Sequence, residues 1–241
     1  MTSEDYLLEN RAETPKRSEW LATLFDEGTF RHLDALGVGP GWRCWEVDAG
    51  GPSVPAWLAE RVGTTGRVLA TDIDDPPVES VDLVHARLVL EHVRDRAEAV
   101  RRMVRAVRPG GWVVIEDFDV DFQASSMPDA SSDHHYLSNR IRAGFLTLLG
   151  ERGIDFELGR KLPRLLRDAG LVEVAADGYF PLALRASAFL EAAHIEQVRA
   201  GLAGMRLASD EELDGYLDAL RRGTLDVATP PLISAWGRVP A

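Results

Sequence analysis

The chain has 241 residues, of which 45% are hydrophobic and 27% charged, and its formal net charge is −12. Such a composition is typical of a globular protein, and the negative charge argues against a nucleic-acid backbone as partner. No apolar run approaches the ~20 residues that span a bilayer, and the N-terminus lacks the basic and apolar regions of a signal peptide. Since Cys44 is the only cysteine, we expect a cytoplasmic protein that acts on a small molecule, with neither nucleic acid nor membrane as partner.

The N-terminal stretch, residues 4–36, carries apolar side chains at roughly helical spacing and ends at Gly37. The Gly28-Thr29 pair predicts a break into two helices. We interpret residues 1–40 as a helical cap.

Residues 42–53, Trp-Arg-Cys-Trp-Glu-Val-Asp-Ala-Gly-Gly-Pro-Ser, combine an apolar strand, a glycine-containing turn and the start of a helix over 53–62. This succession begins a doubly wound α/β nucleotide-binding domain. A second strand over 67–72 ends in Asp72, about 25 residues after the turn, where a carboxylate can accept both hydroxyl groups of a ribose. The motif predicts a ligand at the carboxyl edge of a sheet.

The rest of the chain continues the alternation of strands and helices. Strands are expected at 81–87, 112–116, 171–176 and 232–237, and helices at about 97–107, 133–150, 158–169, 186–204 and 209–222. The block Arg108-Pro109-Gly110-Gly111 predicts a helix stop and a tight turn before the strand 112–116.

These segments resemble the class I S-adenosylmethionine (SAM) dependent methyltransferases, of the actinobacterial type that acts in small-molecule metabolism. Motif I of that family usually reads Glu/Asp-x-Gly-x-Gly-x-Gly. Here it corresponds to Glu46–Pro52, with Asp48 and Pro52 in place of the outer glycines. The resemblance covers about residues 18–240. It implies an α/β, Rossmann-like doubly wound sheet, mostly parallel, with an antiparallel strand near the C-terminus.

One segment departs from that family. Between Asp72 and Val81 the family has a helix and a third strand, whereas this chain has about eight residues that include Pro76-Pro77. Eight extended residues reach ~26 Å, and the diagonal path across two strand spacings is ~20 Å. The sequence therefore predicts a sheet that lacks the third, edge strand.

The resemblance implies SAM as cofactor and assigns nine residues to its binding. These are Glu46, Asp48, Ala49, Gly50, Gly51, Asp72, Ile73, Ala86 and Arg87. His85, Glu91 and His92 flank the expected methyl donor, where one of them could act as a general base; a structural role is the alternative, above all for His85. His194 fits a core or lid histidine.

No His/Cys cluster has metal-ligand spacing, so we expect no metal site. Asp117, Asp119 and Asp121 alternate along a strand end, which describes either a metal site or a solvated strand.

Residues 186–224 lie between the last two expected strands and include a capping box at Ser209 and Glu212. We interpret them as a helical lid inserted into a single domain, 1–241, that encloses a mostly apolar pocket. Three functions stay open: a SAM-dependent methyltransferase, an enzyme of the same fold that has lost SAM and catalyses a cyclisation or proton transfer, and a noncatalytic partner. Both a homodimer and a paralogue partner stay open too.

Overall fold

The computed structural model describes residues 14–71, 76–122, 134–151, 153–182 and 185–241. Six strands form one sheet in the order β2-β1-β3-β4-β6-β5. The strands are β1 (Arg43–Val47), β2 (Arg67–Thr71), β3 (Val81–Arg87), β4 (Val107–Phe118), β5 (Val172–Tyr179) and β6 (Leu232–Arg238). β1 to β4 pair in parallel, and β6 is antiparallel to both β4 and β5. The predicted fold class is confirmed.

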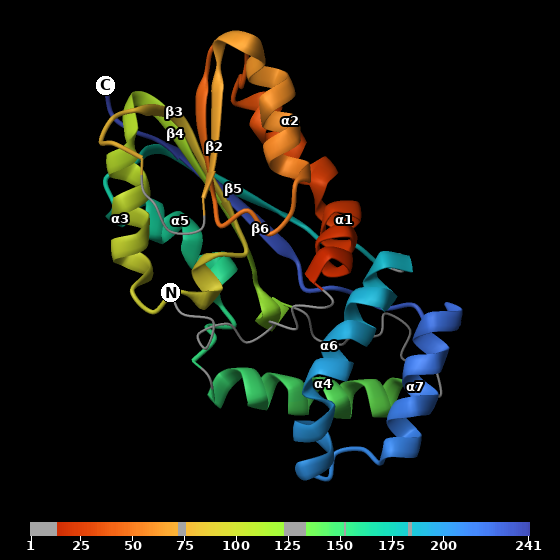
Figure 1. The fold of residues 1–241 in the computed structure, drawn as a ribbon. Helices are drawn as coiled ribbons and strands as arrows, with labels where there is room; N and C mark the ends of the chain where they lie inside the picture. Colours follow the sequence, from red (N-terminus) through yellow and green to blue (C-terminus); the bar gives the residue numbers. More distant parts are fainter. Residues whose placement is uncertain (1–13, 72–75, 123–133, 152, 183–184) are drawn as a thin grey trace.

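The described residues contain seven α-helices, some on the faces of the sheet and others beyond one of its ends (Figure 1). They are α1 (Thr14–Ala35), α2 (Ser53–Val62), α3 (Arg96–Ala106), α4 (His135–Glu151), α5 (Leu158–Asp168), α6 (Arg185–Gly204) and α7 (Asp210–Arg222). Short 3-10 turns lie at Gly63–Thr65, Leu90–His92 and Val120–Phe122. Within the described residues, no helix is both long and apolar enough to cross a membrane.

At β1 and β3, helices cover both faces of the sheet, and neighbouring residues of a strand point to opposite sides. Cys44 of β1 and Leu83 of β3 pack with α1 and α2, whereas Trp45 and Val84 pack with α3 and α5. These four side chains are at most 3% exposed. The sheet is therefore a central layer that holds the carboxyl ends of β1, β3 and β4 at one edge.

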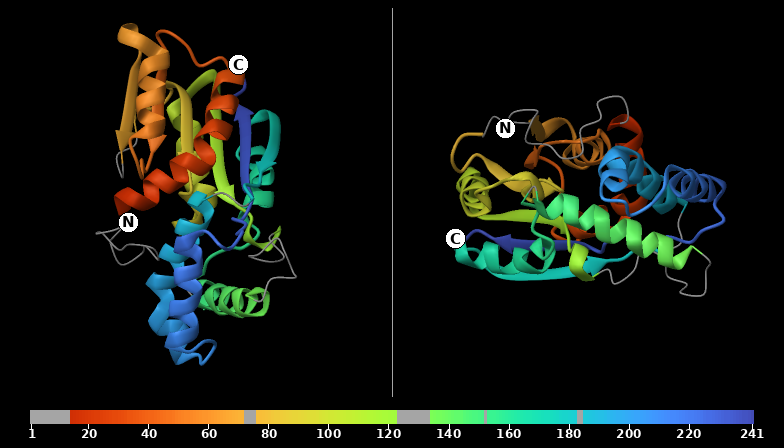
Figure 2. Two further views of the ribbon diagram at one scale, coloured as in Figure 1. Left: turned by 90° about the vertical axis from the view of Figure 1, so that its right-hand side faces the viewer. Right: turned by 90° about the horizontal axis from the view of Figure 1, so that it is seen from below.

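At one end of the sheet, α4, α6 and α7 gather into a separate group of helices (Figures 1 and 2). They share an apolar core of their own, in which Tyr216 is fully buried and its hydroxyl donates to Ser138 Oγ at 3.0 Å. The capping box predicted at Ser209 and Glu212 is present at the start of α7. α6 and α7 stand between β5 and β6 in the chain.

The predicted break of the N-terminal helix is wrong: α1 runs unbroken through Gly28 and Thr29. Thr29 is buried and donates from Oγ1 to Glu116 Oε2 at 2.5 Å, so a tertiary contact holds this turn of the helix in place. A Cβ at Gly28 would meet the ring of Tyr179 at 3.9 Å, which shows how closely α1 approaches the sheet.

Two other segments differ from their expected course. The predicted turn Arg108–Gly111 lies inside β4, because Val107 pairs with Val81 before the register shifts. Gly110 has φ +78° there, and its N–H donates to the Val239 carbonyl at 2.9 Å. β5 is longer than expected and reaches Tyr179.

β2 pairs with β1 alone in the described residues, so it forms the edge of the sheet. Residues 76–80, the described part of the connection to β3, contain neither helix nor strand. The short path between β2 and β3 thus agrees with the predicted lack of a third strand.

Candidate functional site

The turn after β1, residues 48–51, keeps the backbone shape of a glycine turn although Asp48 replaces a glycine. Asp48 has φ +51°, a left-handed conformation that Asp tolerates better than most residues, and its N–H donates to the Thr71 carbonyl at 2.8 Å. A Cβ added at Gly50 would meet no atom of the described residues within 4 Å. This turn therefore leaves open space at Gly50.

Helix α1 packs directly on that turn. The hydroxyl of Ser18 donates to the Gly50 carbonyl, and a Cβ at Gly51 would lie 3.0 Å from the Cβ of Ser18. α2 starts just beyond, after Pro52, which has φ −81° and lacks an N–H to donate. The start of α1 and the start of α2 thus meet at residues 48–51.

Beneath α1 a row of polar side chains, here called the polar band, crosses the sheet on one face. Adjacent members are cross-strand partners or diagonal neighbours on consecutive strands: Glu46 (β1), His85 (β3), Glu116 (β4), Ser234 (β6) and Asp177 (β5). The first four are at most 4% exposed. His85 joins two carboxylates, with Nδ1 2.6 Å from Glu46 Oε2 and Nε2 3.3 Å from Glu116 Oε2.

Glu116 collects further donors. Ser234 Oγ donates to its Oε1 at 2.6 Å, and Thr29 donates to its Oε2. His32 of α1 links the band to its exposed end, with Nε2 2.8 Å from Asp177 Oδ1. The band therefore ties α1 to five strands.

Charge pairing in the polar band shifts the pKa of its members. Burial disfavours the charged imidazole of His85, but the carboxylates of Glu46 and Glu116 outweigh it and raise the pKa of His85 to about 9. Burial likewise opposes ionisation of Glu116, yet the neighbouring imidazoles of His32 and His85 hold its pKa well below its usual range. His85 is thus a buried cation between two carboxylates.

Two other residues expected to bind the cofactor, Arg87 and Ala86, make contacts within the protein. Arg87 Nη1 donates to Asp26 Oδ1 at 2.8 Å and to Thr29 Oγ1 at 3.2 Å, so its charge is paired with α1. Ala86 is buried against α3 and α5. Asp72 and Ile73 lie outside the described residues. Their assignments stay predictions.

The loop after β3 carries the other two candidate catalytic residues. Leu88 has φ +59°, a rare conformation for a branched apolar residue and a sign of local strain. The 3-10 turn Leu90–His92 follows, and His92 Nε2 lies 3.2 Å from Glu91 Oε1. Glu91 and His92 form a carboxylate–imidazole pair beside a cavity, whereas His85 does not line that cavity.

This cavity lies between the carboxyl edge of the sheet and the helices α4 and α6. It encloses about 930 Å³, part of it open to solvent. Apolar side chains make most of its wall, among them Phe118, Val120, Ile141, Phe145, Leu149 and Leu190. Arg17, the residue before Ser18 on α1, also lines it. The cavity and the turn 48–51 thus touch adjacent residues of one helix.

Four buried polar atoms of the cavity have no hydrogen-bond partner among the residues that the structure describes. They are Arg17 Nε, Ser187 Oγ, His194 Nε2 and Thr229 Oγ1. Burial, helped by the charge of Arg17, lowers the pKa of His194 to about 3, so its ring is neutral. Burial also raises the pKa of Glu191 to about 7, against the pull of Arg142. Unpaired buried polar groups are uncommon in proteins, so they make this cavity the candidate ligand site.

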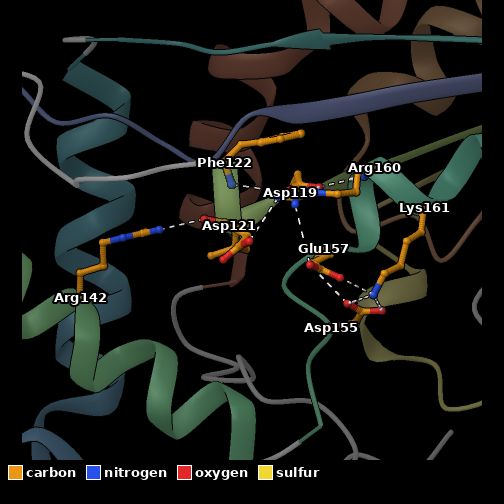
Figure 3. Close-up of polar contacts among 9 residues, drawn as sticks. Asp119, Asp121, Phe122, Arg142, Asp155, Glu157, Arg160 and Lys161 are labelled. Carbon is orange, nitrogen blue, oxygen red and sulfur yellow. Dashed lines mark hydrogen bonds and ion pairs between the residues drawn. The ribbon is translucent and has the colours of Figure 1, made fainter.

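The acidic residues at the end of β4 are mostly buried, so a solvated strand end is wrong for them. Arg160 donates two hydrogen bonds to Asp119, from Nε to Oδ2 at 2.8 Å and from Nη2 to Oδ1 at 2.6 Å (Figure 3). The guanidinium of Arg160 also stacks on the ring of Phe122. Asp117 is fully buried, and burial together with the charge of Glu91 raises its pKa. Of the three acids, Asp121 alone is exposed. In the described ranges, no three His, Cys, Asp or Glu side chains gather as a metal site.

Sequence reasoning missed Arg17 and Glu191 and ranked His194 as a core or lid residue. A signal was present: cavity residues of α6 follow the spacing i, i+3, i+4, i+7, which is one face of a helix. They are Ser187, Leu190, Glu191 and His194, and Ile195 continues this face at i+8. Polar groups on an otherwise apolar helix face could have indicated this site from the sequence. That α4 packs opposite this face of α6 is decided only by the tertiary structure.

Comparison with known proteins gives a family and a fold. A family model described as "Methyltransferase domain" matches residues 19–176. A 37.1 kDa uncharacterized protein in transposon TN4556 of Streptomyces fradiae is 27% identical over 220 residues, which cover 78% of this chain and 57% of that protein.

Two solved structures are those of phosphoethanolamine N-methyltransferase 2 of Haemonchus contortus. One, in complex with phosphomonomethylethanolamine and S-adenosylhomocysteine, has a TM-score of 0.57 at 14% identity, over 100% of this chain and 61% of that chain. The other, in complex with SAM, has a TM-score of 0.50 at 15% identity, over 89% and 53%. At these identities the likeness shows the fold alone. The chain spans less than two thirds of the length of each of these relatives.

Proposed function

Because the chain belongs to the methyltransferase domain family, we propose that it transfers a methyl group from SAM to a small organic acceptor held in the cavity. One observation carries this proposal: Arg17 lines the cavity while Ser18 binds the turn 48–51. Consecutive residues of α1 thus join the acceptor cavity to the turn where the family binds its donor. Transfer depends mainly on holding donor and acceptor close and aligned, which such an arrangement provides.

The turn fits the cofactor in its backbone. Positive φ at Asp48 and the open space at Gly50 support close approach of a ligand to residues 48–51. When bound, SAM supplies the methyl group. Glu46 is held by His85 at the base of the turn, and Ala49 and Gly51 complete it. We expect Asp72 and Ile73 to contact the ribose and adenine, as the family resemblance implies.

A base for the acceptor is available in Glu91 and His92. Both line the cavity, and their pairing at 3.2 Å orients the imidazole. We propose that His92 takes the proton released by an acceptor hydroxyl or amine, and that the Glu91 carboxylate stabilises the resulting imidazolium. His85, enclosed by two carboxylates, holds the turn in position.

Calorimetric titration with SAM and S-adenosylhomocysteine tests this proposal. Saturable micromolar binding is expected for the native chain. Gly50→Leu fills the open space at the turn and should weaken binding at least tenfold. Gly215→Leu is the matched control, since Gly215 is also an exposed glycine without neighbours within 4 Å, on α7. No heat at millimolar ligand would contradict SAM-dependent transfer.

A second candidate is an enzyme of this fold that works without SAM. The Asp48 carboxylate favours it, because a negative charge at that turn repels the carboxylate of SAM. In that case the native chain gives no heat with SAM, while mass analysis of purified protein finds a bound metabolite. With neither heat nor metabolite, a noncatalytic partner becomes the better account.

A further inference from the structure

The unpaired polar groups of the cavity indicate which hydrogen-bonding groups a ligand would need. Ser187 and His194 lie on α6, Thr229 lies just before β6, and each presents a buried atom that no group of the described residues pairs. Ser187 is 1% exposed and Thr229 is 4% exposed. Arg17 Nε is a fourth such atom. An unpaired buried polar group is costly, so a fold that keeps these atoms around one cavity gains most when a ligand supplies the missing partners.

Two arginines and two acids line the cavity: Arg17, Arg142, Glu91 and Glu191. Arg142 interacts electrostatically with Glu191. The electrostatic partner of Arg17 is Glu91, and Arg142 already donates from Nη2 to the Val120 carbonyl at 2.8 Å. A ligand carrying a full charge would have to displace one of these partners after losing its own water. The cavity therefore favours an uncharged ligand.

The unpaired imidazole and hydroxyl groups of the cavity can form hydrogen bonds with an oxygen atom of a ligand. A neutral imidazole nitrogen can donate or accept according to its tautomer, and the hydroxyls of serine and threonine can do both. The ring of His194 is held by stacking on Phe145, with centroids 5.7 Å apart and planes at 14°. Apolar side chains cover most of the remaining wall. One oxygen function on a mostly apolar body satisfies both features.

We propose that the cavity binds a mostly apolar organic compound through one uncharged hydroxyl or carbonyl group, with His194 as the residue that determines this specificity and Ser187 and Thr229 as its co-partners. The identification of this compound as the methyl acceptor rests on the function proposed above; the binding itself does not. This ligand class differs from the phosphorylated amine bound by the Haemonchus contortus enzyme.

Three probes of similar shape test the proposal: 2-naphthol, 2-methylnaphthalene and 2-naphthoate. They carry a hydroxyl, a methyl and a carboxylate at the same ring position. With binding followed by calorimetry or ligand-observed NMR, 2-naphthol should bind about fivefold more tightly than 2-methylnaphthalene, since one neutral hydrogen bond is worth that much. 2-Naphthoate should bind more weakly than 2-naphthol.

Variants then assign the effect to His194. His194→Phe keeps the stack on Phe145 but removes the hydrogen bond, so it should lower 2-naphthol affinity about fivefold and leave 2-methylnaphthalene unchanged. His194→Gln should restore part of the loss. His135→Phe, a histidine of α4 outside the cavity, is the matched control and should change neither affinity. Thermal unfolding of each variant verifies the fold.

Other outcomes overturn the proposal. Tightest binding of 2-naphthoate would make the cavity an anion site governed by Arg17. Equal binding of 2-naphthol and 2-methylnaphthalene, or no saturable binding of 2-naphthol at millimolar concentration, would leave the hydroxyl without a role. His194-dependent binding of 2-naphthol in a chain that shows no heat with SAM would refute methyl transfer and keep this inference, because the probes need no cofactor.

Discussion

Two regions of this molecule bury polar side chains and treat them in opposite ways. In the polar band, Glu46, His85, Glu116 and Ser234 are enclosed and hydrogen-bonded to one another. In the cavity, buried atoms of Arg17, Ser187, His194 and Thr229 have no hydrogen-bond partner in the described part of the chain. Both regions lie near the carboxyl edge of the sheet, and both contact α1. The polar band is hydrogen-bonded by other groups of the protein, whereas the cavity atoms would need a ligand to form their hydrogen bonds.

The comparison separates residues that stabilise the fold from residues whose unpaired polar atoms are available to a ligand. A satisfied buried network rigidifies a protein, and breaking one member leaves the others unpaired. An unsatisfied group already carries its cost in the free protein, so removing it is cheap and affects binding instead. By this reasoning we propose that His85 is a positioning residue for the turn 48–51 and that His194 is a binding residue.

The largest expected effect comes from His85→Leu. The substitution leaves Glu46 and Glu116 buried without their shared cation, which should cost about 3–5 kcal/mol in free energy of unfolding. Urea denaturation at neutral pH measures it. His194→Phe is the matched histidine in the cavity and should cost less than about 1 kcal/mol. Equal losses for the two variants would erase the distinction between the regions.

A dependence on pH should follow from the same histidine. Its pKa is about 9 in the folded protein against an ordinary value of 6.5, so its contribution is complete below pH 6.5 and disappears as the pH rises through 9. At about 1.4 kcal/mol per pKa unit, the loss is about 3 kcal/mol. Denaturation curves at pH 6 and pH 9.5 measure it, and His85→Gln should remove most of the slope. A slope unchanged in that variant would assign it to other groups.

Two buried serines provide the next comparison. Ser234→Ala removes a donor from the ionised Glu116 and should cost about 1–2 kcal/mol, whereas Ser187→Ala removes an unpaired hydroxyl and should change stability by less than about 0.5 kcal/mol. Both variants delete one hydroxyl from a fully buried serine. If Ser187→Ala proves the more harmful of the two, the cavity has a structural role.

The smallest effect is expected at the turn between the two regions. Asp48→Gly keeps the positive φ and removes a carboxylate from the proposed donor site, so affinity for S-adenosylhomocysteine should rise about fivefold, or about 1 kcal/mol. Titration calorimetry measures it, with Asp34→Gly as a control because Asp34 is an acid of α1 paired with Arg61 and outside the turn. A fall in affinity would indicate that Asp48 contacts the ligand productively.

Local sequence determined most of the fold. The helix 53–62 and the strand 81–87 were predicted at the residues where α2 and β3 lie, because apolar periodicity and turn residues act over short distances. The turn at 48–51 was predicted for the same reason. The error at Gly28-Thr29 has the opposite cause: helix propensity is a weak, local term, and contact of Thr29 with Glu116, 87 positions away, overrides it.

The candidate site also has a part that local sequence predicts and a part that depends on tertiary contacts. Glu91 and His92 could be proposed from the sequence because they follow a strand at the carboxyl edge. The pairing of His85 with Glu46 and Glu116 could not, because it depends on the register of three strands. Nor could the cavity, which needs α1, α4 and α6 to meet over the sheet. Sequence alone determined the order of elements and the shape of the turn; tertiary structure decided which polar groups are paired and which are left for a ligand, since pairing depends on neighbours distant in the chain.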